Sequence, residues 1–387
     1  MSHIRNIRLL LSFVGILLLA GCQNDSVEPA GGDKQSTMEM IPLSKPFLEV
    51  QRMGTRADDD YPHLPSGYVP FSVLYPSTLP EHKTIGVFMT PEKTSSLGNF
   101  LYDEEGVNMW KSTVFVTEGH DYYVYGFMPR EDAESASIAP LNGGYSEGAV
   151  LSINNYKTLT PADVCVIVGV RNATAAEKIS GPAAAVPLGK FYYQGKENGN
   201  NYIFVLLKHL YAGIHFETRI DPDYHKLRNI KIRRMELMAE DINEYVNLTV
   251  TLTSNEDGND PVTSVDYALS STTANDTIDL FKASDPSDDS QLLEVHETAD
   301  SFLGCFVPNS CRSFVLRTTY NVYDSKGNLI REGCVAENKF TSSKIPELES
   351  IDAGNIVTLQ LLIQPTYLYM LSDPDLDNPT FTLNTTP

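Results

Sequence analysis

The chain has 387 residues, of which 42% are hydrophobic and 20% charged, and its formal net charge is -21. This composition is typical of a folded globular protein, and the length suffices for two domains with sizeable cores. So acidic a surface repels phosphate backbones and no basic cluster offsets it, which argues against nucleic acid as a partner.

The N-terminus has the layout of an export signal. Arg5 and Arg8 precede an apolar run, Leu9–Leu19, which is followed by small residues. The run is too short to span the roughly 30 Å hydrocarbon core of a membrane as a helix.

The sequence LAGC, which ends at Cys22, resembles the lipobox of bacterial lipoproteins. The resemblance implies a signal peptide over residues 1–21, cleavage between Gly21 and Cys22, and fatty acylation such as palmitate at Cys22, which anchors the chain firmly. The alternative is an ordinary signal peptide with a chance cysteine.

The next segment, residues 22–56, is predicted to combine a tether with a short strand. Residues 23 to about 46 are rich in Ser, Gly, Pro, Asp and Gln, a composition that favours a flexible linker. Apolar residues then recur between Phe47 and Met53 and indicate a short strand.

Strand-like runs bounded by turn residues fill the first half of the mature chain, and helical periodicity is scarce. TIGVFMT (Thr84–Thr90) is one such run. VCVIVGV (Val164–Val170) is apolar on both faces and is predicted to be a buried central strand. STVFVT (Ser112–Thr117) and DYYVYGFM (Asp121–Met128) predict a hairpin across residues 118–120.

The second half continues this pattern. The long run Tyr202–Ile220 contains Gly213 and is predicted to form two strands with a bend. A turn at Asp324–Gly327 predicts a hairpin between SFVLRTTYNVYD and NLIREGCVA. The many short strands predict an all-β protein of two tandem sandwiches with Greek-key connections. The polar stretch Gly195–Asn200 places the domains at residues 57–200 and 201–387.

The remaining cysteines allow two interpretations. Cys305 and Cys311 flank a turn in CFVPNSC and suit a cross-strand disulfide in an exported protein. Alternatively, Cys165, Cys305, Cys311 and Cys334 are four separate buried thiols.

Motifs of catalysis and metal binding are weak. Gly144–Gly148 matches G-x-S-x-G, but a strand-like run follows where a nucleophile elbow needs a helix, so a plain loop is expected. Asp373, Asp375 and Asp377 lack the glycine and glutamate of a calcium loop and indicate an acidic turn. His209 lies among apolar residues and is predicted to belong to the core. With no Walker loop or dinucleotide fingerprint, we expect no enzymatic activity, cofactor or metal.

Two long segments resemble the fimbrillin-like proteins of Bacteroidales. Ile85–Arg130 is similar to their first domain, and Leu206–Leu237 is similar to the opening of their second domain. The resemblance is carried mainly by Trp110, Tyr123, Tyr125, His209 and Tyr224. It implies two transthyretin-like β-sandwiches, export as a lipoprotein to the outer membrane, and assembly into type V pili by donor-strand exchange.

The resemblance also implies that an arginine-specific protease removes the N-terminal segment with its first strand. Arg56-Ala57 is the expected cleavage site and Arg52 the second choice, although Asp58–Asp60 disfavour cleavage. The alternative is an uncut linker. The C-terminal Pro379–Pro387 suits either a donor strand or a plain last strand, so a stalk, anchor or tip subunit all stay open.

Two functions are therefore considered. The first is a fimbrial subunit or adhesion lipoprotein whose partners are other pilus subunits, with a host or bacterial surface glycan or protein as a further partner. The second is a surface glycan-binding lipoprotein, because the chain has 20 tyrosines and exposed aromatic rings stack on sugars. Asp276-Thr277-Ile278 also resembles an O-glycosylation motif of exported proteins in this bacterial group, with Thr277 as the acceptor.

Overall fold

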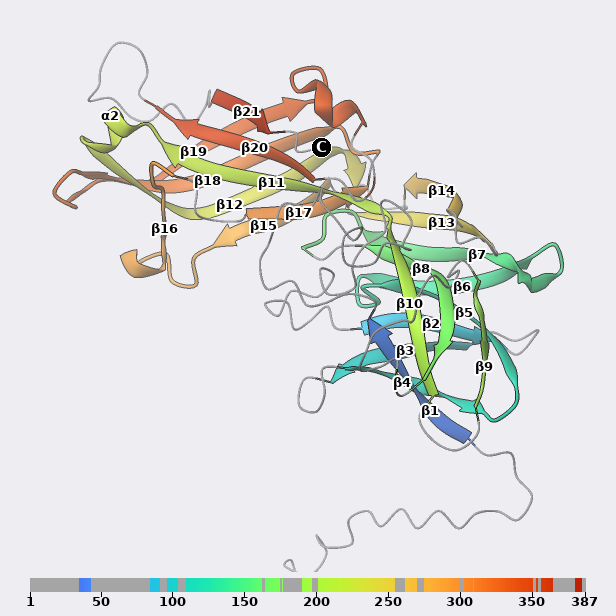
Figure 1. Ribbon diagram of the computed structural model, residues 1–387. Coiled ribbons are helices and arrows are strands. Elements are labelled where there is room, and N and C mark those ends of the chain that lie inside the picture. Colours follow the sequence, from blue (N-terminus) through green and yellow to red (C-terminus); the bar gives the residue numbers. More distant parts are fainter. Residues whose placement is uncertain are drawn as a thin grey trace, which may run out of the picture. The chain divides into compact units, whose positions relative to one another are not determined.

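The protein is described here from a computed structural model, in which strands dominate. The structure describes residues 35–42, 84–90, 96–103, 109–161, 164–174, 176, 190–196, 201–254, 262–269, 275–298, 303–308, 310–350, 353, 356–364 and 380–384. They form four sheets, so the predicted all-β class is confirmed (Figure 1).

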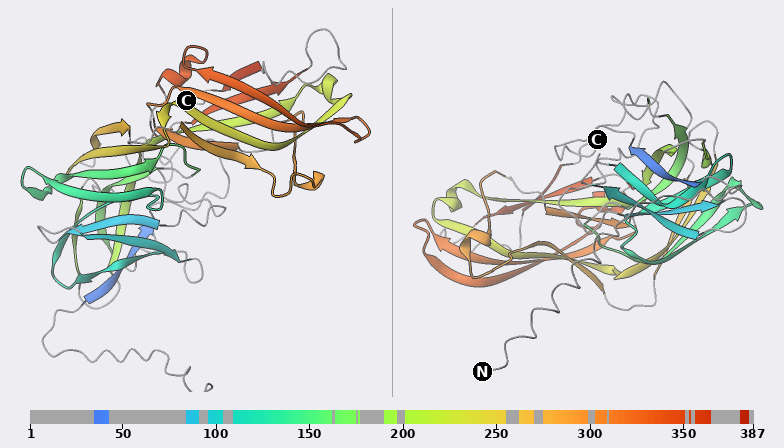
Figure 2. Two further views of the ribbon diagram at one scale, coloured as in Figure 1. Left: turned by 180° about the vertical axis from the view of Figure 1, so that it is seen from behind. Right: turned by 90° about the horizontal axis from the view of Figure 1, so that it is seen from below.

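The largest sheet, sheet A, follows the order β2-β3-β4-β1-β10-β8-β5-β9. Its strands are β1 (Gln35–Pro42), β2 (Thr84–Thr90), β3 (Ser96–Asp103), β4 (Met109–Thr117), β5 (Asp121–Met128), β8 (Cys165–Ala173), β9 (Tyr192–Gln194) and β10 (Asn201–His209). Because β2 also pairs with β5, every strand except β9 belongs to a closed ring. The blue strand β1 lies in that ring between β4 and β10 (Figure 2).

Strand β8 of sheet A is buried on both faces, as predicted for the strand Val164–Val170. Val166 and Val168 of β8 belong to one apolar cluster, whereas Cys165 and Ile167 belong to another. The second cluster also contains residues of β2, β4, β5 and β10, so it fills the inside of the ring. An apolar pattern on both faces of β8 follows directly from this double burial.

The predicted hairpin between β4 and β5 is wrong, although both strands exist. β4 pairs with β1 and β3, whereas β5 pairs with β2, β8 and β9. The turn between β4 and β5 is hydrogen-bonded to Gly195. The Gly119 amide donates to the Gly195 carbonyl at 2.9 Å, and the Gly195 amide donates to the His120 carbonyl at 2.9 Å. Since β1 occupies the edge of β4 that β5 would need, the two strands separate after the turn.

Sheet B, in the order β14-β13-β7-β6, combines strands from both halves of the sequence. It contains β6 (Ala133–Leu141), β7 (Gly144–Lys157), β13 (Tyr245–Thr253) and β14 (Val262–Leu269), with β13 beside β7 in Figure 1. It packs on sheet A through aromatic residues: the Tyr125 hydroxyl donates to the Tyr145 carbonyl at 2.6 Å, and the Phe127 and Tyr156 rings meet edge to face. β10, β13 and β14 all lie beyond residue 200, so the sheets cross the boundary predicted there.

The other two sheets use the rest of the chain. Sheet C has the order β17-β11-β20-β21 and contains β11 (Tyr211–Ile220), β17 (Leu303–Pro308), β20 (Ile356–Ile363) and β21 (Thr380–Asn384). Sheet D has the order β15-β12-β18-β19 and contains β12 (Arg228–Asn243), β15 (Asn275–Lys282), β18 (Ser313–Asp324) and β19 (Leu329–Thr341), with β16 (Leu293–Glu294) beside β12. Phe216 of sheet C and Phe314 of sheet D both contact the Phe340 ring, so the two sheets share a core.

Two predictions for this region are confirmed in outline. The hairpin across Asp324–Gly327 joins β18 to β19. The run Tyr202–Ile220 forms two strands, and the break falls at Leu210, not at Gly213. Short helical turns connect other strands, namely α2 (Pro222–His225), η3 (Asp289–Gln291) and η4 (Pro346–Ser350). In the described part of the chain, no helix has the length and apolar character needed to cross a membrane.

The prediction of a flexible tether up to residue 46 is wrong for Gln35–Pro42, because these residues form β1. The strand expected between Phe47 and Met53 lies outside the described residues.

Backbone crowding at Gly148 gives a test of the sheet B register. Gly148 has φ +129°, and a Cβ there would lie 2.1 Å from the Leu252 carbonyl oxygen on β13. Gly143 also has positive φ, +91°, but a Cβ there would meet nothing within 4 Å. We expect Gly143→Ala to cost about 1 kcal/mol of unfolding free energy and Gly148→Ala at least ~2 kcal/mol more, measured by urea denaturation. Equal effects of the two substitutions would contradict the β7–β13 register.

Candidate functional site

The β1 position is the first candidate site, because β1 completes the ring of sheet A. β1 runs antiparallel to β4, over Trp110–Thr117, and parallel to β10, over Asn201–Val205. β4 and β10 are not neighbours in the sheet order, so β1 supplies the backbone partners of both strands on this side. A closed sheet has no free edges, whereas a sheet without β1 would present two.

Apolar side chains lie behind the β1 position. Val116 of β4 and Ile203, Val205 and Leu207 of β10 belong to the cluster inside the ring, and each is at most 2% exposed. Without β1, this apolar interior would be open to water between two unpaired strand edges. Such a groove binds an extended strand through main-chain hydrogen bonds and side-chain pockets.

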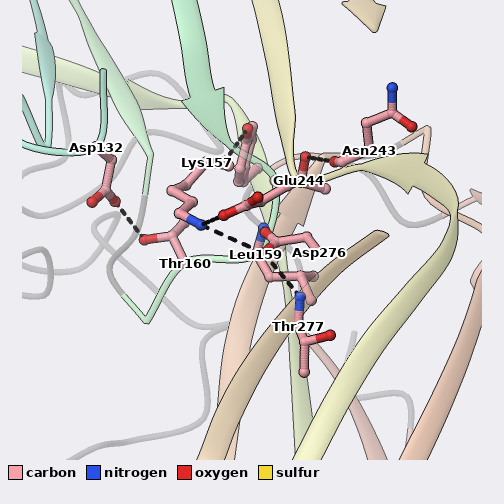
Figure 3. A network of polar contacts seen from close by, with 10 residues as sticks. Asp132, Lys157, Leu159, Thr160, Asn243, Glu244, Asp276 and Thr277 are labelled. Atoms are coloured by element: carbon pink, nitrogen blue, oxygen red, sulfur yellow. Dashed lines mark hydrogen bonds and ion pairs between the residues drawn. The ribbon is translucent and has the colours of Figure 1, made fainter. Parts of the chain in front are cut away.

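The second candidate site is a polar seam, which we define as Lys157–Thr160 at the end of β7 together with the groups that they contact. Figure 3 shows how this segment meets residues from later parts of the chain. The Lys157 carbonyl accepts a hydrogen bond from the Tyr211 hydroxyl at 2.8 Å. The Thr158 amide donates to the Glu244 carbonyl at 3.1 Å. The segment is thereby attached to β11 and to the turn between β12 and β13.

The last two residues of the segment reach sheets C and D. The Leu159 amide donates to the Asp276 carboxylate of β15 at 2.5 Å. Thr160 forms a two-way backbone bridge with Phe306 of β17, at 3.1 and 2.8 Å. The Thr160 hydroxyl donates to the Asp132 carboxylate at 2.8 Å. Each residue from 157 to 160 therefore bonds to a strand or turn of the second half of the sequence.

Two carboxylates share one ammonium group in the seam. The Lys157 Nζ lies 2.6 Å from Glu244 Oε1 and 3.7 Å from Asp276 Oδ1. The Asp276 side chain is only 3% exposed, and burial raises its pKa to about 6 although Leu159, Lys157 and Thr277 oppose the shift. Burial lowers the pKa of Lys157, but Glu244 and Asp276 outweigh this and the pKa is raised overall. The hydrogen bond from Lys157 lowers the pKa of Glu244.

Most of the predicted processing residues lie outside the described part of the chain. These are Gly21, Cys22, Arg52, Arg56 and Ala57. Asp373, Asp375 and Asp377 also lie outside it. At the C-terminus, β21 (Thr380–Asn384) pairs antiparallel with β20, so this segment is the last strand of its own sheet C.

The structure decides between the alternatives for cysteine. Cys165, Cys305, Cys311 and Cys334 are all thiols, so the Cys305–Cys311 disulfide is not formed. His209 is 8% exposed, with Nδ1 3.7 Å from Cys165 Sγ, as expected of a core histidine.

The structure also shows where the remaining sequence motifs lie. Gly144–Gly148 opens strand β7, so the expected loop is wrong, and the run that follows is a strand. Thr277 is exposed on β15, whereas the neighbouring Asp276 is buried in the seam; its O-glycosylation stays a prediction. Among the described residues, no group of three or more His, Cys, Asp or Glu side chains is arranged to hold a metal.

Most tyrosines whose side chains the structure describes are buried. In the described part of the chain Tyr192 is the exposed one, at 38%, and its hydroxyl donates to Asp121 at 2.7 Å. Five of the largest fully buried side chains are Tyr125, Tyr156, Tyr193, Tyr211 and Tyr224. The tyrosine count therefore does not translate into a broad aromatic platform in the described residues.

No protein-family model and no curated protein matches the chain. Among solved structures, a fimbrial protein of Bacteroides vulgatus has 10% identity and a TM-score of 0.34, covering 80% of this chain and 95% of its own. The fimbrial anchor protein Mfa2 of Porphyromonas gingivalis has 10% identity and a TM-score of 0.25, covering 81% of this chain and 91% of its own. A candidate cell adhesion protein of Bacteroides uniformis has 8% identity and a TM-score of 0.39, covering 91% and 97%.

These neighbours are Bacteroidales proteins of the kind that the sequence resembles. TM-scores this low do not establish a common fold, so function is inferred below from the chain's own residues.

The sequence did not reveal β1 or the seam. β1 carried one signal, the alternation of Met38 and Met40 with polar residues, inside a segment of linker composition. For the contact of Asp276 with Leu159 no sequence signal existed, because the two residues lie 117 positions apart.

Removing the seam ammonium tests whether it compensates the buried carboxylate. We expect Lys157→Met to lower the unfolding free energy at neutral pH by about 2 kcal/mol, because Glu244 loses its ion pair and Asp276 must either stay charged without a cation or take up a proton. The matched control is Lys226→Met, which removes an ammonium 2.6 Å from Asp223 at a site where both side chains are at least 70% exposed. That pair is solvated, so no measurable change is expected. Similar losses for both variants in urea denaturation would show that the seam is ordinary surface.

Proposed function

We propose that this chain is a fimbrial subunit or pilus-associated adhesion lipoprotein that joins other subunits by exchanging β1 for a strand of a neighbour. The role is structural and requires no cofactor. The observation that carries the proposal is the position of β1 between β4 and β10, where it completes the ring of sheet A.

The connection from β1 to the rest of the ring supports processing at arginine. β1 ends at Pro42 and β2 begins at Thr84, so Arg52 and Arg56 both lie in the connection between them. A cut after Arg56 would leave β1 held only by hydrogen bonds and side-chain packing. An extended strand from another subunit would then restore the backbone pairing and cover the apolar interior.

The same cut would separate the lipid from the ring. The proposed anchor at Cys22 and β1 lie on one side of Arg56, and all the other described strands lie on the other side. Loss of β1 would therefore free the remaining protein from the outer membrane at the moment when its groove opens. An uncut chain would keep both its ring and its anchor.

Lipidation is tested separately from strand exchange. In cells, Cys22→Ala should move the protein from the membrane fraction to the soluble fraction, because one cysteine carries the anchor. Cys334→Ala is the control, since this residue lies on β19 far along the sequence and should stay membrane-bound. Retention of the Cys22→Ala protein in the membrane would refute the lipid anchor and leave the role of β1 untouched.

Strand exchange is tested by limited trypsin treatment of the purified full chain. Cleavage should occur at Arg56 and be followed by ladders on unheated SDS gels, because an exchanged strand dissociates slowly. Arg56→Ala should abolish both the cleavage and the ladders. Arg52→Ala tests the second candidate cleavage site. Arg317→Ala, at a side chain 52% exposed on β18, is the control and should behave as wild type. A wild-type chain that is cut, loses β1 and never forms ladders would end the strand-exchange proposal.

A further inference from the structure

The seam contains a buried acid whose charge is not balanced locally. The Asp276 carboxylate accepts hydrogen bonds from the Leu159 amide at 2.5 Å and the Thr277 amide at 2.9 Å. Its nearest cation is Lys157 Nζ at 3.7 Å, which makes a closer contact of 2.6 Å with Glu244. With Asp276 ionised, two negative charges face one positive charge; Asp276 is 3% exposed, whereas Lys157 and Glu244 are 33% and 34% exposed.

The other titratable groups around Asp276 do not supply a second cation. Tyr211 of β11 and Cys305 of β17 are the further ionisable groups whose pKa values feel the Asp276 charge. Burial, with a smaller contribution from Asp276, raises the pKa of both groups, so both stay neutral at physiological pH. The groups facing Asp276 are therefore one ammonium, one carboxylate, one neutral phenol and one neutral thiol.

Binding of one proton would balance these charges. When Asp276 is neutral, Lys157 and Glu244 form a one-to-one ion pair at 2.6 Å. The neutral carboxyl group still has an oxygen that accepts from Leu159, so the link between β7 and β15 does not depend on the charge. Protonation thus removes the cost of burying an ion and keeps the hydrogen bond.

We propose that the seam is a proton-sensitive joint, in which uptake of one proton by Asp276 stabilises the attachment of Lys157–Thr160 to β15. This device is independent of strand exchange, since it lies in sheets B and D and involves no residue of β1.

The sign of the pH dependence follows from the pKa shift. Burial raises the Asp276 pKa to about 6 in the folded chain, whereas an unfolded chain has the ordinary value of about 4. The folded state therefore binds the proton more tightly, and stability falls as pH rises through the window between these values. Below about pH 4 both states are protonated and the full stabilisation is present.

The test compares the full chain with Asp276→Asn, which resembles the protonated acid in shape and charge. Unfolding constants are measured in urea at several pH values from about 4.5 to 7.5. Between these limits the wild-type unfolding constant should rise roughly 20-fold relative to that of the variant, because only wild type can release the proton. Asp223→Asn, at a side chain 72% exposed, is the control for the loss of one carboxylate. A constant or falling ratio of wild type to Asp276→Asn would overturn the proposal.

A second measurement does not depend on the variant's ability to fold. The backbone amides of Leu159 and Thr277 donate to the Asp276 carboxyl group, so their nitrogen-15 and proton chemical shifts report its titration. Both amides should titrate together in the wild-type chain with a midpoint near pH 6. A shared midpoint below about 4 would show that Lys157 and the two amides hold the acid ionised, and would equally overturn the proposal.

Discussion

The structure depends first on the completeness of backbone pairing in sheet A. A ring of strands satisfies every edge only while each member is present, and β1 is the member that precedes Arg56 in the sequence. The side chains inside the ring, among them Ile203 and Val205, are buried because the ring is closed. One strand therefore protects both polar backbone groups and an apolar core. This double dependence makes the β1 position a place where a strand from another molecule would be bound firmly.

The polar seam shows a second constraint. Through it, one short segment attaches sheets A and B to sheets C and D. Four consecutive residues, Lys157–Thr160, contact β11, the β12–β13 turn, β15 and β17. Backbone groups make most of these bonds, and the buried side chains of Thr158 and Leu159 add to them, since the Thr158 hydroxyl donates to the Asn243 carbonyl and Leu159 packs in the core. The charged part is concentrated at Lys157, Glu244 and Asp276, where burial and charge balance oppose each other. The Asp276 carboxyl group belongs to both parts, because it accepts the Leu159 amide and also lies near the Lys157 ammonium group.

Local pattern was sufficient for most strands and for the β18–β19 hairpin, because alternation and turn chemistry are properties of short segments. It failed where a distant strand intervened. The β4–β5 hairpin looked favourable from Ser112–Met128 alone, yet β1 pairs with β4 and displaces β5. β13 likewise returns to pair with β7, so sheet B joins strands from both sides of residue 200, which the local pattern did not indicate. Asp276 was seen as part of a glycosylation motif, and nothing in its neighbourhood in sequence indicates the contact with Leu159.

Under the proposed strand exchange, the order of segments along the chain would give the two sites different fates. Cys22 and β1 both precede Arg56, so the proposed lipid anchor and the strand between β4 and β10 lie within one N-terminal segment. The seam lies wholly in the remainder, between residues 132 and 306, and would be unchanged by loss of that segment. A subunit that exchanges its first strand must keep its sheets attached while one of them is open. The bonds of Lys157–Thr160 provide that attachment, because none of them passes through β1, β4 or β10.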